Sequence, residues 1–222
     1  MSMAIHLSAL DPLAVIFDLD GTLIDSTSDI ATGANMVREH FGLAPWPEAD
    51  VAAHIGWGLG HLLVNTLPEL GPEEVQAGRA VFLQAYGTHL LDHTVPYPMV
   101  PEALSALSAA DIPLGLVTNK PGMFLEPVLE GLSWQSTFGC VFGGDTLPTR
   151  KPDPGPLLEA AAALEVPPAR CLYVGDTEVD AEAASRAEMP FACVPWGRAA
   201  EGVNRVDSST VDFDALAIWA RR

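Results

Sequence analysis

The stretch DLDGTLID at 18–25 constrains the fold and chemistry of this chain more than any other. It directly follows the apolar run at 13–17, which is typical of a strand covered on both faces in a parallel sheet. Asp18 and Asp20 therefore stand where this strand ends, and ligands of open α/β sheets bind beyond the carboxyl ends of the strands. Gly21 permits a tight turn at the same place.

Two acids this close together have two interpretations. Carboxylates repel each other when both are ionised, and a hard cation such as Mg2+ relieves that repulsion. Alternatively, Asp18 and Asp20 only cap the helix that follows, because Asp favours such positions. The metal interpretation requires cations and a further acid at the ends of other strands.

A change of pattern along the chain predicts two domains. Residues 26–92 read as helices throughout, whereas the later part of the chain alternates strand, loop and helix. Such alternation predicts a parallel sheet with helices on both faces. We therefore expect an α/β core domain formed by 1–24 and 97–222, and a helical domain at 25–96 joined to it by a proline-rich hinge.

Polar loops follow three later strands of the predicted sheet. They are Thr118-Asn119-Lys120, then Arg150-Lys151-Pro152-Asp153, then Gly175-Asp176-Thr177-Glu178-Val179-Asp180. With Asp18 and Asp20, these loops bring carboxylates, a hydroxyl and ammonium groups to one edge of the sheet. A phosphoryl group needs this set, because its oxygens require donors and positive charge and its transfer requires an in-line nucleophile.

Composition limits the partners and the location. The formal net charge of −18 repels polyanions, so we expect neither nucleic acid nor an anionic membrane surface as a partner. No apolar run approaches the roughly 20 residues that span a bilayer, and the first ten residues hold no Lys or Arg, so we expect a cytoplasmic protein. Cys140, Cys171 and Cys193 are widely spaced in or beside strand-like runs, which predicts buried, reduced thiols.

Five segments of the chain carry a resemblance to a known family. DLDGTLIDS, PYPxVPE, VTNKP, RKPDPGPL and VGDTxxDxxAA follow one another over nearly the whole chain. Their wording resembles the haloacid dehalogenase superfamily and, within it, the phosphoglycolate phosphatase subfamily. The resemblance implies a Rossmann-like core with a parallel five-stranded sheet, an inserted all-helical cap, and a Mg2+-dependent phosphatase that acts on a small anionic phosphate ester, 2-phosphoglycolate above others.

The resemblance implies roles for the acids. Asp18 would be the nucleophile that takes the phosphoryl group as an aspartyl phosphate. Asp20 would protonate the leaving oxygen, then activate water, and would give its backbone carbonyl to the metal. Asp18, Asp20 and Asp176 would hold Mg2+. Asp180 would lie beside this site, either as a ligand through water or as a residue that orients Lys151.

The resemblance also implies which groups bind the phosphate. Thr118 and Lys151 would bind the phosphoryl oxygens, and Lys151 would keep Asp18 ionised. Asn119 would supply a backbone donor. Lys120 has two interpretations: it either touches the substrate or only adds positive potential at the mouth of the cleft.

Within the helical segment, the glycine-rich turn at 56–60 has two interpretations as well. Gly56 and Trp57 either contact the substrate, since backbone can approach a ligand closely at glycine, or the turn simply ends a helix. His54 and His61 flank this turn, and we expect them to pack within the cap.

At three places, Met99, Asp111 and Glu188 stand where the family wording has glycine. These are turn or helix-end positions at which glycine adopts a left-handed conformation. We expect them to affect local geometry, and Met99 adjoins the predicted hinge.

Two alternative functions stay open. A phosphatase for another small ester or for pyrophosphate, or a phosphosugar mutase, would share all four motifs and differ in the cap. The cap has no lysine, and its arginines are Arg38 and Arg79, which disfavours a mutase that handles a bisphosphate. A non-catalytic binding protein on the same fold would usually lack an essential acid or lysine, and this chain has each of them.

Overall fold

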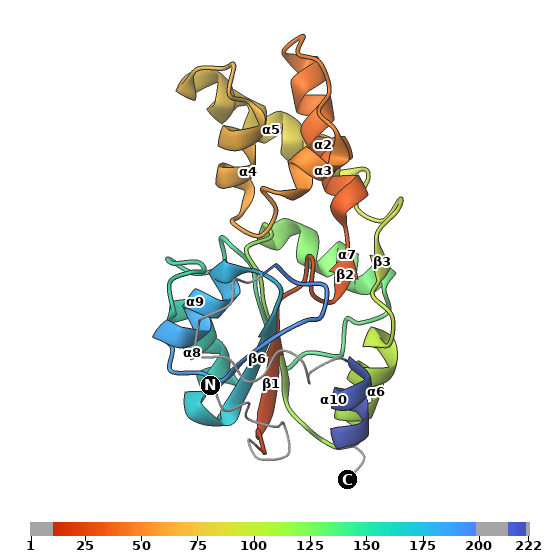
Figure 1. Ribbon diagram of the computed structural model, residues 1–222, viewed down its shortest axis with the longest axis vertical. Coiled ribbons are helices and arrows are strands. Elements are labelled where there is room, and N and C mark those ends of the chain that lie inside the picture. The colour runs from red at the N-terminus through yellow and green to blue at the C-terminus, as the bar shows by residue number, and fades with distance from the viewer. Residues whose placement is uncertain (1–10, 199–212, 221–222) are drawn as a thin grey trace.

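A five-stranded parallel sheet forms the centre of the chain (Figure 1), in a computed structural model that describes residues 11–198 and 213–220. The strand order is β5-β4-β1-β6-β7. The strand bounds are β1 Ala14–Phe17, β4 Leu114–Val117, β5 Cys140–Phe142, β6 Cys171–Gly175 and β7 Phe191–Cys193. The chain thus leaves β1 toward β4 and β5 and later returns to β6 on its other side, which makes the carboxyl end of β1 a topological switch point.

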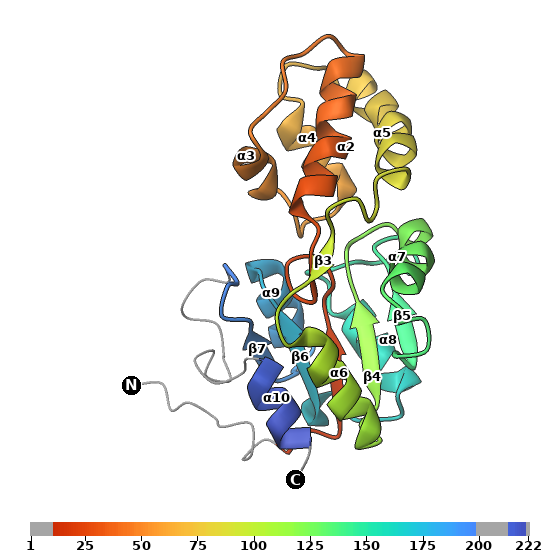
Figure 2. The same ribbon diagram turned by 90° about the vertical axis from the view of Figure 1, so that its right-hand side faces the viewer.

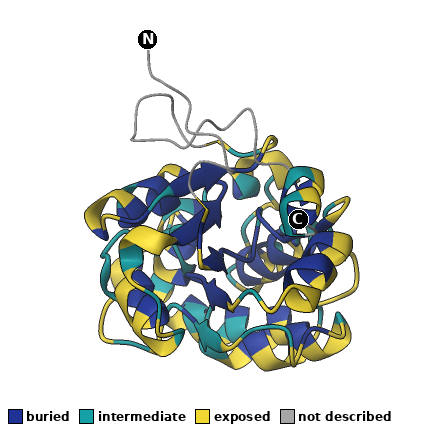
Figure 3. Ribbon diagram, turned by 90° about the horizontal axis from the view of Figure 1, so that it is seen from below, coloured by how far each residue is buried: buried dark blue, intermediate teal, exposed yellow. Residues whose placement is uncertain are grey.

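The central strand is buried on both faces because every residue of β1 is apolar. Val15 and Phe17 pack into one hydrophobic cluster, and Ala14 and Ile16 pack into a second cluster across the sheet. Full burial of side chains such as Phe17 stabilises the fold by about 1.5–3 kcal/mol each. Buried residues accordingly fill the middle of the core, and exposed residues ring it (Figure 3).

Helices cover both faces of this sheet, which confirms the predicted fold class. The first cluster draws on α6 Val100–Ala109, α7 Leu125–Gly131 and α10 Phe213–Ala220, and the second on α8 Gly155–Ala163 and α9 Glu178–Arg186. The short helices η1 Gly122–Phe124 and η2 Pro168–Arg170 precede α7 and β6. No helix in the described ranges is long and apolar enough to cross a membrane.

A separate group of helices stands over the carboxyl edge of the sheet (Figure 2). Its members are α2 Thr27–His40, α3 Glu48–Ala52, α4 Leu59–Thr66 and α5 Pro72–Gly87. They bury a hydrophobic cluster of their own, to which Val37, Leu63 and Phe82 belong. We call this group the cap; its boundaries at 25 and 96 stay a prediction.

The chain crosses between core and cap through a pair of short strands that the sequence did not predict. β2 Ile24–Asp25 pairs antiparallel with β3 Val95–Pro96. The buried Asp29 carboxylate secures the pair, because it accepts hydrogen bonds from the backbone N–H groups of His93 and Thr94 at 2.8–3.1 Å and from the Thr94 hydroxyl at 2.7 Å. Both crossings therefore lie side by side.

The three non-glycine residues at family glycine positions adopt the left-handed conformation that the sequence predicts. The φ angle is 65° at Met99, 56° at Asp111 and 53° at Glu188. Such a conformation costs a non-glycine residue roughly 1–2 kcal/mol. Met99 immediately precedes α6, where the chain enters the core from β3.

Candidate active site

Loops from separate parts of the chain converge at the carboxyl end of β1. Asp18 follows β1, Thr118 follows β4, Asp176 follows β6, and Lys151 precedes α8. The register pairs Phe17 with both Leu116 and Val174, so neighbouring strands end at the same level and their loops meet. These four residues are therefore brought together, and all are nine-tenths or more buried.

Lys151 lies at the centre of this site. Its ammonium Nζ is 2.9 Å from Asp18 Oδ1 and 2.6 Å from Asp180 Oδ1. Burial favours the neutral amine, but the two carboxylates outweigh it and raise the pKa of Lys151, so the ammonium form persists. The Tyr173 hydroxyl accepts a further hydrogen bond from Nζ at 2.8 Å.

Asp180 is occupied by these contacts and by its own helix. Its Oδ2 accepts hydrogen bonds from the Thr177 N–H at 3.0 Å and the Thr177 hydroxyl at 2.7 Å, in a capping box at the start of α9. Burial raises the pKa of Asp180, but Lys151 and Thr177 outweigh burial and lower it. Of the two interpretations of Asp180, the geometry favours the one in which it orients Lys151.

Three buried carboxylates could hold a metal ion. Oxygens of Asp18, Asp176 and Asp180 lie within 4.8 Å of one another. Burial raises the pKa of Asp18 to about 6 and raises the pKa of Asp176 well above its usual range, with Asp180 adding to both. Burial is the main cause of both pKa shifts, and a divalent cation bound between these carboxylates would favour their ionised forms.

The surroundings of these acids fit a cation. Asp18 Oδ1 has Lys151 as an ion-pair partner but accepts no well-directed hydrogen bond. A Cβ atom at Gly21 would lie 2.5 Å from Asp176 Oδ2, so the backbone there approaches the carboxylate as only glycine allows, at a φ of 84°. An all-oxygen donor set of this kind suits Mg2+. Since Asp180 is occupied, Asp18 and Asp176 are the side chains that would hold it.

Asp20 faces a different set of partners. Its carboxylate accepts a hydrogen bond from the Ser26 hydroxyl at 2.6 Å and lies 2.9 and 3.2 Å from Lys120 Nζ. Ser26 precedes α2, yet its side chain bonds Asp20 and does not cap that helix. The Asp20 side chain is thus turned away from the acid cluster, which agrees with a metal contact through its backbone carbonyl only.

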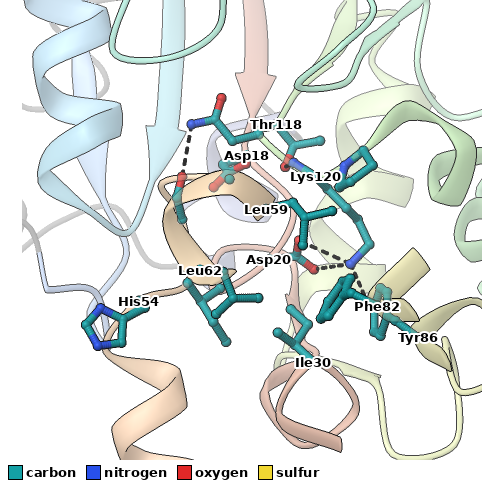
Figure 4. Close-up of a pocket in the computed structure, with 15 residues that line it drawn as sticks. Asp18, Asp20, Ile30, His54, Leu59, Leu62, Phe82, Tyr86, Thr118 and Lys120 are labelled. Carbon is teal, nitrogen blue, oxygen red and sulfur yellow. Dashed lines mark hydrogen bonds and ion pairs between the residues drawn. The ribbon is translucent and has the colours of Figure 1, made fainter. Parts of the chain in front are cut away.

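Lys120 is buried and lines the pocket, which favours the interpretation in which it contacts the substrate. Besides Asp20, its ammonium reaches the Tyr86 hydroxyl of α5 at 2.5 Å (Figure 4). Burial would lower the pKa of Lys120, but Asp20 and Tyr86 outweigh burial and raise it. A charged ammonium therefore links a core carboxylate to the cap.

The glycine-rich turn of the cap touches the core beside this site. Asn119 Nδ2 donates hydrogen bonds to the Gly56 carbonyl at 3.0 Å and to the Lys151 carbonyl at 2.9 Å. Gly56 and Gly58 line the pocket above Asp18, whereas Trp57 is not among its lining residues and stacks on His61 at 5.4 Å. Asn119 contacts the cap and the Lys151 loop through its side chain, and its role as a backbone donor stays a prediction.

Sequence reasoning missed the tyrosines of this site. Tyr86 sits within a helical segment where its spacing reads as ordinary packing, and Tyr173 sits inside β6 as one more apolar-looking strand residue. Both hydroxyls are buried and each contacts a lysine ammonium. A buried tyrosine hydroxyl requires a polar partner. The chain has two lysines, and their scarcity was the signal that could have pointed to partners such as these tyrosines.

The fold and the site together define a class of protein: a phosphohydrolase on a doubly wound α/β core with a helical cap. The family model described as haloacid dehalogenase-like hydrolase matches residues 15–194. The chain belongs to this family.

Relatives and solved structures agree with this assignment. The chain is 37% identical over 206 residues to a phosphoglycolate phosphatase of Chromobacterium violaceum, covering 90% of each chain. It is 40% identical over 186 residues to one of Xylella fastidiosa, covering 84% of this chain and 81% of the relative. The crystal structure of a predicted phosphoglycolate phosphatase from Haemophilus somnus matches with a TM-score of 0.85 and 28% identity, covering 96% of this chain and 99% of that one.

Proposed function

We propose that this phosphatase is Mg2+-dependent, acts through an aspartyl-phosphate intermediate on Asp18, and hydrolyses 2-phosphoglycolate. The observation that carries the mechanism is the ion pair between Asp18 and Lys151, because it places a charged, buried nucleophile beside a cation that can bind phosphoryl oxygens. The relatives at 37–40% identity support the substrate, since they are named for it.

In the first half of the reaction, a carboxylate oxygen of Asp18 attacks the phosphorus atom in line with the ester oxygen. The bond from phosphorus to the ester oxygen breaks, and Asp20 in its acid form gives that oxygen a proton. The alcohol leaves, and Asp18 carries the phosphoryl group. Lys151 and the Thr118 hydroxyl bind the phosphoryl oxygens as their charge develops.

In the second half, Asp20 accepts a proton from a water molecule, whose oxygen attacks the same phosphorus atom. The bond between Asp18 and phosphorus then breaks and inorganic phosphate leaves. Asp20 suits both tasks because Ser26 and Lys120 hold its carboxylate beside the pocket without drawing it into the acid cluster.

Asp18, Asp176 and the Asp20 backbone carbonyl are the groups that would hold Mg2+. When bound, Mg2+ would neutralise the charge that the acids and the phosphoryl group share. Lys151 keeps its place through Asp180 and Tyr173, so the phosphate-binding cation is fixed independently of the metal.

Phosphate release by the Asp18→Asn variant tests the mechanism. An amide in place of the nucleophile should reduce turnover of 2-phosphoglycolate by at least about a thousandfold, because the covalent route is lost. Asp50→Asn, an exposed cap position, is the matched control and should keep full activity. Unchanged turnover by a folded Asp18→Asn protein would contradict the proposal.

A panel of phosphate esters, with a bisphosphate activator in a parallel series, tests the substrate. We expect 2-phosphoglycolate to give the highest kcat/KM and the bisphosphate to have no activating effect. Activation by the bisphosphate together with isomerisation of a sugar phosphate would support the mutase alternative instead.

A further inference from the structure

The pocket between cap and core has two unlike walls. The core supplies the polar wall, which includes Asp18, Asp20, Thr118 and Lys120. The cap supplies a largely apolar wall that includes Ile30, Leu59, Leu62 and Phe82, with His54 and Tyr86 as its polar members (Figure 4). A leaving group that enters this pocket therefore meets hydrocarbon on the cap side and charge on the core side.

The pocket is also limited in size. Its empty space is about 470 Å³, which includes solvent at its open side. Apolar side chains offer no partners for hydroxyl groups, so each sugar hydroxyl buried against them would lose its hydrogen bonds to water. The pocket thus favours a short leaving group without a chain of hydroxyls.

Lys120 is the one Lys or Arg among the residues that line this pocket. The cap arginines serve elsewhere: Arg38 is buried against Glu69 at 2.8 Å, and Arg79 lines a separate surface groove. Lys151 has Asp18, Asp180 and Tyr173 as partners. An anionic end of the leaving group therefore has Lys120 as its available lysine or arginine.

The ammonium of Lys120 can exchange one of its hydrogen bonds for a bond to a ligand. Its three N–H bonds face three acceptor atoms, namely the two Asp20 oxygens at 2.9 and 3.2 Å and the Tyr86 hydroxyl at 2.5 Å. The contact with Asp20 Oδ2 is the longest of the three, and Asp20 keeps its Oδ1 contact without it. Because Lys120 lines the pocket, a ligand oxygen there can take the place of Oδ2.

We propose that Lys120 is a specificity-determining residue that binds the carboxylate of a short phosphate ester, while the apolar cap wall covers its carbon atoms. This inference rests on the proposed function and assigns the anionic end of the substrate to a core residue. Tyr86 completes the subsite from the cap, because its hydroxyl and ring hold the ammonium in place at 2.5 Å and 4.6 Å.

The experiment compares two esters that differ only in the carboxylate. For 2-phosphoglycolate and ethyl phosphate, the ratio of kcat/KM values should be on the order of a hundred in the unchanged protein. The Lys120→Met variant should bring this ratio close to one. If Lys120 only positioned Asp20, its loss would slow hydrolysis of both esters equally and leave the ratio of kcat/KM values unchanged. An unchanged ratio in Lys120→Met would therefore overturn the inference.

Arg79→Met is the matched control, because it removes a cap cation that lies outside the pocket. Its ratio of kcat/KM values should equal that of the unchanged protein. An equal loss of the ratio in Arg79→Met and Lys120→Met would show that overall charge decides the preference, and this would also overturn the inference.

A binding measurement on the unchanged protein removes any dependence on how the variant folds. With Mg2+ present, 3-phosphonopropionate should bind about a hundredfold more tightly than propylphosphonate, which has a methyl group in place of the carboxylate. Equal affinities would overturn the inference. Failure of the proposed function has a different signature, namely no hydrolysis of either ester or of p-nitrophenyl phosphate.

Discussion

Tyr173 connects three parts of the site through one hydroxyl group. It accepts a hydrogen bond from Lys151 Nζ at 2.8 Å, lies 2.9 Å from Asp180 Oδ1 as a donor, and lies 3.2 Å from the Val117 carbonyl. Val117 is the residue before Thr118, so this hydroxyl sets the distance between the lysine and the loop that holds the phosphate-binding hydroxyl. Tyr173 is therefore a positioning residue.

The Tyr173→Phe variant should keep the packing of β6 and lose this alignment. We expect kcat to fall by about tenfold with a smaller change in KM, and the free energy of unfolding to fall by about 1 kcal/mol. Steady-state kinetics and urea denaturation measure the two effects. Tyr97→Phe is a control that keeps a ring against Trp196 outside the site, and a kcat loss of the same size there would contradict the assignment.

The cysteines behave as packing residues with suppressed reactivity. Cys171 and Cys193 are buried, and Cys140 is half-buried. The predicted burial is therefore complete for two of the three, and the reduced state stays a prediction. Burial raises the pKa of Cys140 to about 11, and burial together with Cys140 raises the pKa of Cys171 to about 11.

A raised thiol pKa means that the reactive thiolate is scarce at pH 8. About one in a thousand of the Cys140 and Cys171 thiols is ionised there, and this fraction grows tenfold with each pH unit up to about 11. A thiol reagent at pH 8 should therefore label the folded protein slowly and the unfolded protein at all three sites. Rapid labelling of Cys140 in the folded protein would show that its pKa is not raised.

At the scale of elements, the sequence predicted the helices and strands whose burial shows as a local pattern of apolar residues. The run that forms β1 is apolar at every position, and glycine or proline bounds most helices. The pairing of β2 with β3 was not predictable, because each strand has two residues and their partnership depends on Asp29 meeting Thr94 across 65 positions. The helix α5 ends at Gly87, five residues before the expected end at 92.

Arg38 joins two parts of the cap through backbone carbonyl groups. Its Nε donates to the carbonyl of the exposed residue Ala44 at 2.6 Å and its Nη1 donates to the carbonyl of the buried Thr66 at 2.5 Å, while Nη2 pairs with Glu69. Glu69 is partly exposed, so the ion pair contributes little. The stabilising effect comes mainly from the bond to the buried Thr66 carbonyl.

Arg38→Met should therefore lower the free energy of unfolding of the cap by about 1–3 kcal/mol, because it leaves the buried Thr66 carbonyl without its donor. Urea denaturation followed by tryptophan fluorescence measures this loss, since Trp46 lies 4.9 Å from the guanidinium. Arg79→Met provides the comparison at a less buried cap arginine. A loss below 0.5 kcal/mol in Arg38→Met would contradict the role given to this carbonyl.

At the scale of the whole molecule, a few contacts bring the cap onto the core. Asn119 bonds the Gly56 carbonyl, Lys120 bonds the Tyr86 hydroxyl, and Arg198 Nη1 donates to the Ala52 carbonyl at 3.1 Å. Motif residues were predictable because they lie in the loops after their strands, directly for Asp18, Thr118 and Asp176 and at some distance for Lys151. Their partners in the cap were not, because the docking of two separately packed parts leaves no periodic signal in the sequence.

The acid cluster predicts that a divalent cation stabilises the molecule. Asp18, Asp176 and Asp180 are buried beside Lys151, so three carboxylates share one ammonium. A cation bound only by the folded state stabilises it by RT ln(1 + [L]/Kd). With a Kd of about 0.1–1 mM, 10 mM Mg2+ adds about 1.4–2.7 kcal/mol.

Thermal unfolding with EDTA and with 10 mM Mg2+ measures the stabilisation by the cation without any substrate. We expect Mg2+ to raise Tm in the unchanged protein. In EDTA, Asp176→Asn should be more stable than the unchanged protein, because one of the repelling charges is gone. The same variant should gain little stability from Mg2+. Glu178→Gln is the control for charge alone, since it removes an exposed acid two residues away. If Glu178→Gln and Asp176→Asn lose the Mg2+ response equally, the ion acts by screening; if only Asp176→Asn loses it, the ion occupies the buried site.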